Sequence, residues 1–211
     1  MSLASDGERV LVEAPEADVV TLEEMKKHLR EDSNDFDDYI EGLTASVIST
    51  IDPASGGGLG RALREQTWEL QLRGFPTCES EDGLLIRLPF PPLIEVVSVK
   101  YDNLNGVEQT LVEDTDFRVV GLGGRSKQSL IPLYNSYWPS ARCYPASVRI
   151  RFTCGYAVSE GEPDLLPEAI KAYIKLMVGD LYANREASSI TTGSLVQNPN
   201  FERLLDPHRV Y

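Results

Sequence analysis

The segment LPEAIKAYIKLMVGDLYANRE, residues 166–186, constrains the fold of this chain more than any other stretch. Its apolar residues recur at spacings of three and four, which predicts an α-helix. One stripe consists of Ile170, Tyr173, Ile174, Met177 and Leu181. A second group widens the apolar surface around the helix and consists of Ala169, Ala172, Leu176 and Ala183. Because a helix with a single core-facing stripe would not need this second group, we expect the helix to be covered on two sides.

Two further helices are predicted near the start of the chain. Thr21 and Glu24 have the spacing of a capping box, which predicts a helix that ends near Arg30. Ser33 or Asp32 can cap a second helix, because short oxygen-bearing side chains accept hydrogen bonds from the first backbone amides. The apolar stripe of this second helix is Phe36, Ile40, Leu43, Val47 and Ile51. A proline and a run of glycines follow the stripe and end the helix.

In the middle of the chain, at about residues 63–156, apolar side chains recur at every second residue instead of every third or fourth. Apolar and polar residues alternate in residues 67–73 and again in 148–154. The same alternation predicts three inward-facing side chains in another strand, those of Val97, Val99 and Tyr101. Asn105-Gly106 is a strong signal for a hairpin turn. Short alternating segments separated by turn residues predict an antiparallel sheet or a small barrel.

These patterns predict an α+β fold with a small helical core and an inserted antiparallel β region. The core consists of two N-terminal helices plus one long C-terminal helix. The predicted organisation is a flexible acidic arm at 1–20, a single structural domain at 21–186 and a C-terminal tail at 187–211. Within the domain, the helices occupy 21–52 and 164–186, and the β insertion occupies about 63–156.

The charge balance restricts the classes of function. The chain has 33 acidic and 20 basic residues, a formal net charge of −13. A dedicated binder of nucleic acid or of anionic membranes carries a basic face, so this balance argues against both classes. Arg149 and Arg151 lie on one face of a predicted strand and could contact phosphates, but exposed strand positions often carry arginine.

Features of the termini and the cysteines indicate a soluble protein made in the cytoplasm. The first twenty residues have no signal-peptide pattern, and no apolar run approaches the ~18 residues of a membrane span. The three cysteines are Cys78, Cys143 and Cys154. They lack any paired or CxxC spacing, which is typical of free thiols in a reducing compartment.

No pattern in the sequence predicts catalysis, so we assign no catalytic, cofactor-binding or metal-ligating residue. The glycine-rich stretches 55–63 and 121–129 lack the spacing that cradles a phosphate group. The two histidines, His28 and His208, lie near opposite ends of the chain and have no neighbouring nucleophile or metal-ligand spacing.

Six segments, taken together and in order, resemble a known family. They are TLEEMKKHLREDSNDFDDYIEGLTASV, REQTWELQLRGFP, LPFPPLIEVVSVKYDN, VRIRFTCGY, LPEAIKAYIKLMVGDLYANRE and LLDPHR, and they cover most of residues 21–209. Their order resembles that of the head–tail connector, or head-completion, proteins of tailed double-stranded DNA phages, including prophage copies. The segments are structural patterns, and none is a catalytic signature. The acidic arm and the glycine-rich insertion at 55–60 are less typical of the family.

The resemblance implies a structural virion protein without enzymatic activity, cofactors or membrane contact. It implies a ring of about twelve copies at the head–tail junction, in which each copy exposes two different complementary surfaces. The partners would be further copies of the chain, the portal protein and a tail completion protein, while DNA passes through the ring without specific binding. Duplex DNA carries about one charge per 1.7 Å, so an acidic lumen would let it slide.

Under this resemblance the functional residues form interfaces. One candidate is the apolar patch of the tail, which either docks a partner and orders on assembly or packs onto its own subunit: Phe201, Leu204 and Leu205. The other is the small-residue side of the long helix, which the sheet or a neighbouring subunit could approach closely: Ala172, Leu176, Gly179 and Ala183. Two alternatives stay open, another phage head or tail completion protein and an uncharacterised hydrolase with an acidic pair.

Overall fold

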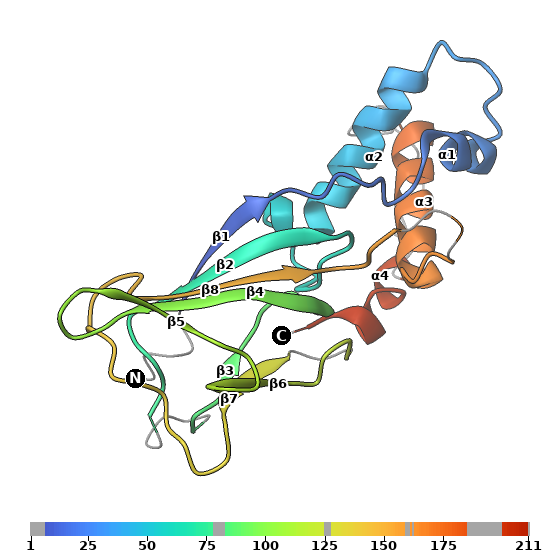
Figure 1. Ribbon diagram of the computed structural model, residues 1–211. Helices are drawn as coiled ribbons and strands as arrows, with labels where there is room; N and C mark the ends of the chain where they lie inside the picture. The colour runs from blue at the N-terminus through green and yellow to red at the C-terminus, as the bar shows by residue number, and fades with distance from the viewer. Residues whose placement is uncertain are drawn as a thin grey trace.

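A computed structural model describes residues 7–77, 83–124, 128–158, 161, 163–184 and 200–210, the last of these without the side chains of 200 and 201. Its helices are α1 (Leu22–Leu29), α2 (Asp37–Ile51), α3 (Glu168–Ala183) and α4 (Asn200–Arg203), with 3-10 turns η1 (Pro53–Ser55) and η2 (Asp206–His208). Its strands are β1 (Glu8–Glu13), β2 (Gln66–Leu72), β3 (Ile86–Arg87), β4 (Leu93–Asp102), β5 (Glu108–Leu111), β6 (Phe117–Val120), β7 (Ser129–Pro132) and β8 (Val148–Cys154). This arrangement confirms the predicted α+β class (Figure 1).

The three predicted helices pack together at one end of the molecule (Figure 1). Helix α1 begins as expected, because the Thr21 hydroxyl accepts a hydrogen bond from the Glu24 amide at 3.2 Å. The stripe of α2 and the stripe of α3 meet in a hydrophobic cluster that also contains Met25 of α1. Val178 of α3 is fully buried in this cluster, whereas Leu181 of the predicted stripe is exposed. The buried side of α3 is therefore turned slightly from the predicted stripe.

The predicted cap of the second helix is wrong. Helix α2 begins at Asp37, four residues after Ser33, and its first turn has no side-chain cap. The Ser33 hydroxyl instead accepts a hydrogen bond from the amide of Asp35 in the preceding turn. Lys26 of α1 binds the Asp37 carboxylate at 2.7 Å. The start of α2 is thus fixed by an ion pair to α1 that local capping rules do not include.

The β region consists of two antiparallel sheets that share one hydrophobic cluster. The larger sheet has the strand order β1-β2-β8-β4-β5, and the smaller has the order β3-β7-β6. In β2 the inward residues Trp68, Leu70 and Leu72 are buried as the alternation predicts. The predicted hairpin at Asn105-Gly106 connects β4 to β5. The antiparallel insertion is therefore confirmed.

The prediction of a flexible arm at 1–20 is wrong for residues 8–13. These residues form β1, which pairs antiparallel with β2 at the edge of the larger sheet. Most side chains of β1 are exposed, and Leu11 is the one that packs against the cluster of the sheet. An edge strand is held mainly by its backbone hydrogen bonds, so its side chains carry little of the alternation that marks a half-buried strand.

The predicted inward position of Val97 is also wrong. The side chain of Val97 is 51% exposed, while Val99 is fully buried. The pairing of β4 with β8 shifts register between Val96 and Ser98. Such a bulge adds one residue to a strand and turns the neighbouring side chain to the other face. Strict alternation therefore fails at Val97.

A buried arginine connects the helical core to the larger sheet. The guanidinium of Arg64 donates to both carboxylate oxygens of Asp164, at 2.9 and 2.8 Å. It also donates to the backbone carbonyls of Asp18 and Val19. Lys171 of α3 contacts the same carboxylate at 2.7 Å. One side chain, 3% exposed, therefore joins the segments that precede α1, β2 and α3.

We predict that Asp164→Asn destabilises the protein by about 3 kcal/mol at neutral pH, because it leaves the Arg64 guanidinium buried without its ionic partner. Urea unfolding followed by circular dichroism measures this difference. The control Glu168→Gln changes an exposed carboxylate 3.6 Å from Lys171 and is expected to cost less than about 1 kcal/mol.

The same pair predicts a pH dependence. Hydrogen bonds from Arg64, assisted by Lys171 and opposed by burial, hold the pKa of the Asp164 carboxyl well below its usual value. Its contribution is therefore complete above the unfolded-state pKa of about 4 and is lost as pH falls further. The stability difference between wild type and Asp164→Asn should shrink below about pH 4. A difference that stays constant down to pH 2 would contradict this assignment.

Candidate functional site

The buried titratable groups near the junction of helices and sheet serve structure. Asp52 is 2% exposed, and its carboxylate accepts hydrogen bonds from the amides of Ala54 and Leu63. Burial raises the pKa of Asp52, against these hydrogen bonds. Burial, and then the charge of Asp52, also raises the pKa of the Cys154 thiol. A substrate cannot reach either group, so neither supports the hydrolase alternative.

Other candidates for chemistry lie apart from one another. Within the residues that the structure describes, no group of three or more His, Cys, Asp or Glu side chains could hold a metal ion. His28 lies beside Gly179 of α3, and the backbone carbonyl of His208 accepts a hydrogen bond from Arg61. In the described part of the chain, no helix is long and apolar enough to cross a bilayer.

Arg149 and Arg151 are engaged in ion pairs on the sheet. Arg149 binds Asp102 at 2.8 Å and Glu108 at 3.0 Å, and Arg151 binds Glu69 at 3.1 Å. The hydrogen bonds to Asp102, together with its charge and that of Glu108, raise the pKa of Arg149 against the effect of burial. Cross-strand pairing explains both arginines, as expected of exposed strand positions.

The apolar patch of the C-terminal tail packs onto its own chain. Leu205 is 3% exposed and belongs to the cluster between α2 and α3, and Leu204 is partly buried against it. The alternative in which the patch packs onto its own subunit therefore describes Leu205. The backbone of Phe201 lies in α4, and its side chain is outside the described residues.

The segment that follows Leu205 is held by the glycine-rich loop after α2. Arg61, 3% exposed, donates from Nε to the His208 carbonyl at 3.1 Å. The amide of Val210 donates to the Leu59 carbonyl at 3.0 Å. Gly60 has a positive φ of 70°, and the Val210 carbonyl oxygen occupies the place where its Cβ would lie. Glycine is required here by both backbone conformation and space.

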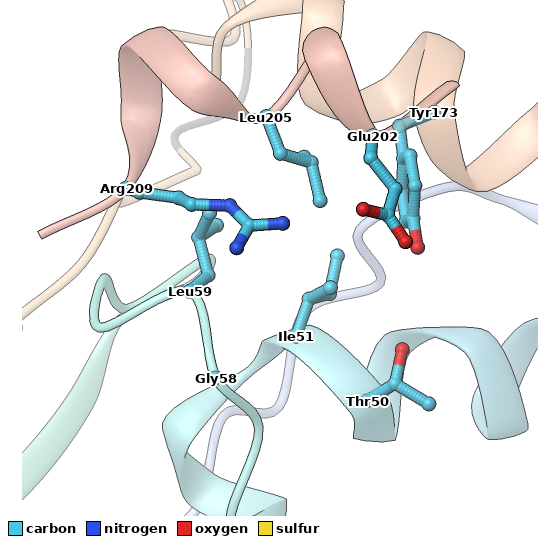
Figure 2. Close-up of a pocket in the computed structure, with 8 residues that line it drawn as sticks. All are labelled: Thr50, Ile51, Gly58, Leu59, Tyr173, Glu202, Leu205 and Arg209. Atoms are coloured by element: carbon cyan, nitrogen blue, oxygen red, sulfur yellow. The ribbon is translucent and has the colours of Figure 1, made fainter. Parts of the chain in front are cut away.

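A small pocket lies between this segment, the end of α2 and α3 (Figure 2). Its apolar side is formed by Ile51, Leu59 and Leu205. Figure 2 shows the Arg209 guanidinium and the Glu202 carboxylate pointing into the pocket from opposite sides. The volume is about 190 Å³, smaller than the 300–1,000 Å³ of most ligand sites. A pocket of this size suits a single side chain rather than a substrate.

Helix α3 presents its small residues in three different environments. At Gly179, a Cβ would lie 3.6 Å from His28 Nε2 and 3.9 Å from Leu29 Cδ2, so α1 of the same chain covers this position. Ala172 and Leu176 are half-buried, and Ala183 is exposed. The predicted close approach at Gly179 is thus made by α1 and not by the sheet. A contact of the other three with a partner stays a prediction.

Sequence reasoning missed Arg61, Gly60 and the pocket residues Glu202 and Arg209. The glycine run at 55–60 was available as a signal, because successive glycines after a helix often mark a close backbone approach. Its partner at Val210 lies 150 residues away in the sequence, so the pattern could not identify it.

We predict that Gly60→Ala releases the C-terminal segment, since the new Cβ would collide with the Val210 carbonyl and strain the backbone at positive φ. Limited proteolysis should cleave within residues 200–210 several-fold faster, and stability should fall by about 1–3 kcal/mol. Gly58→Ala is the matched control, because its Cβ would meet nothing within 4 Å. Equal cleavage of the two variants would show that the segment is held by other contacts.

Comparisons by sequence find no match, either to a protein-family model or to a curated protein. Comparison with solved structures finds a similar fold in a chain from the virion of a native gene transfer agent particle. The two chains are 19% identical, with a TM-score of 0.71, and the match covers 96% of this chain and 95% of that chain. A chain in the neck of the empty particle, computed with C6 symmetry, matches at 19% identity and a TM-score of 0.71, covering 97% and 96% of the two chains. A chain in the neck of the native particle, computed with C12 symmetry, matches at 17% identity and a TM-score of 0.64 over 97% and 96%. The chain therefore has the fold of a chain in the neck of gene transfer agent particles, in agreement with its resemblance to phage connectors.

Proposed function

We propose that this chain is a structural neck protein of a phage-like particle, whose copies close into a ring adaptor between portal and tail. One observation carries the proposal: the likeness extends over 97% of the chain to chains in particle necks that were computed with C6 or C12 symmetry. The likeness thus includes both the helical core and the β region. In this role the chain works by assembly at the head–tail junction of the virion and not as an enzyme.

A closed ring needs a head-to-tail interface, in which one surface of each copy meets a different surface of the next. The half-buried Ala172 and Leu176 and the exposed Ala183 are candidates for such a contact on α3. The tail segment that carries Phe201, Leu204 and Leu205 can offer its outer surface to the portal or tail protein while Leu205 stays in the core.

The acidic balance suits a ring through which DNA moves. Each copy contributes a net charge of −13, and a ring repeats this charge around its axis. An excess of negative charge disfavours tight binding to phosphates, so DNA would pass without specific contacts. The ion pairs engage two cations of the sheet, Arg149 and Arg151, that could otherwise hold the duplex.

We predict that the purified chain, alone or mixed with the portal protein of the same particle, forms closed rings. Negative-stain electron microscopy would show ring-shaped particles, and light scattering would give a mass that is a large multiple of 23.4 kDa. Cross-linking to the portal protein tests the position in the neck. A chain that stays monomeric both alone and with portal and tail proteins would refute the ring adaptor.

A further inference from the structure

The end of the β4–β5 hairpin carries an exposed group of residues that resembles an interface. Leu104 is 70% exposed and Val107 is 54% exposed on either side of the turn. The neighbouring segment is bound to the hairpin, because the Arg142 amide donates to the Asp102 carbonyl at 2.9 Å. The Arg142 guanidinium lies 5.3 Å from the centre of the Tyr144 ring. We name Leu104, Val107, Arg142 and Tyr144 the hairpin end.

The composition of the hairpin end is typical of interface hot spots. Arginine and tyrosine are enriched in such sites, and a guanidinium held against a ring loses less freedom when it binds. The local charge is also unusual for this chain. Three cations surround two carboxylates there: Lys100 and Arg149 form ion pairs with Asp102 and Glu108, and the charge of Arg142 also acts on Asp102. The hairpin end is thus locally positive on a molecule with a net charge of −13.

The outer face of α2 has the complementary character. At its start, Asp38 and Glu41 are exposed, and residues 31–41 contain six carboxylates and no lysine or arginine. Farther along the same face the exposed residues are small and uncharged: Gly42, Ala45, Ser46 and Ser49. We name these six residues the α2 face.

The α2 face is suited to close packing. The hydroxyls of Ser46 and Ser49 donate to carbonyls of their own helix, at 2.7 Å each, so they need no further partner. Residues 42–51 contain no charged side chain, although solvated helix faces normally carry several. A protruding apolar residue can therefore approach the small residues of this face without burying a charge or an unsatisfied hydroxyl.

We propose that the hairpin end of one copy docks on the α2 face of the next copy. Arg142 would meet the carboxylates of Asp38 and Glu41, and Leu104 with Val107 would pack on the small residues beyond them. The two surfaces lie at opposite ends of the molecule, the hairpin turn at the left and the start of α2 at the upper right of Figure 1. Different surfaces at opposite ends make a head-to-tail contact that can close a ring. This inference rests on the proposed function and names the surfaces that would form its ring.

Charge reversal tests the contact under conditions in which the wild type forms rings. Arg142→Glu alone, and Asp38→Lys with Glu41→Lys, should each raise the concentration needed for half-assembly roughly tenfold or more, because like charges would face each other. Sedimentation velocity measures the ring fraction, and circular dichroism checks that each variant is folded. Matched controls are Arg118→Glu, on the exposed side of β6, and the double change Glu16→Lys with Glu23→Lys, at exposed positions of the N-terminal region. These controls should leave assembly within about twofold of the wild type.

Mixing the two reversed variants gives a sharper test. In a head-to-tail ring that alternates the two variants, every hairpin end meets an α2 face of opposite charge, so the mixture should recover rings that neither variant forms alone. The triple variant should also recover them. Reversed variants that assemble like the wild type, or a mixture and a triple variant that both stay unassembled, would overturn the contact while leaving the ring adaptor intact. Failure of the wild type to form rings would instead count against the proposed function.

Discussion

The bidentate pair between Arg64 and Asp164 fixes how the two halves of the molecule meet. A charge as deeply buried as that of Arg64 must be paired and hydrogen-bonded, since removing it from water otherwise costs several kcal/mol. Its hydrogen bonds reach the backbone before α1, and Asp164 also fixes the start of α3 by accepting from the Leu166 amide at 2.9 Å. Arg64 itself lies two residues before β2. The helical core and the larger sheet are thereby connected by one group of contacts.

Periodicity predicted the elements whose side chains divide cleanly between core and solvent. The stripes of α2 and α3 and the alternation of β2 and β8 are all of this kind. The failures share a different physical cause. Strand β1 is held by backbone pairing at an edge, the bulge at Val97 depends on the register with β8, and the start of α2 depends on Lys26 of another helix. Each depends on a partner distant in sequence, which a local pattern cannot contain.

The candidate interfaces show the same limit. An apolar patch near a chain end has the same sequence pattern whether it packs onto its own chain or contacts a partner. Leu205 packs onto its own chain because Arg61 and the glycine-rich loop hold the segment that follows it. The small residues of the α2 face lie in a stretch without charged side chains, residues 42–51, yet only the fold shows that they are exposed. Conversely, the hairpin end joins residues some 40 positions apart, so no window of sequence contains it.

Assembly of a strongly acidic chain imposes a condition on its interface. Copies with a net charge of −13 repel one another, but at physiological ionic strength this repulsion is screened beyond about 8 Å. The contact between copies must therefore supply opposite charge at short range, where screening is weak. Two cations of the larger sheet are unsuited to this, since Arg149 and Arg151 already bind carboxylates of that sheet. Arg142 is different, because its guanidinium lies over the Tyr144 ring, which orients the cation, and Asp102 acts on it through its charge. A cation held in this way stays available to a neighbouring carboxylate, and so acidic copies can associate at one defined point while they repel DNA and one another elsewhere.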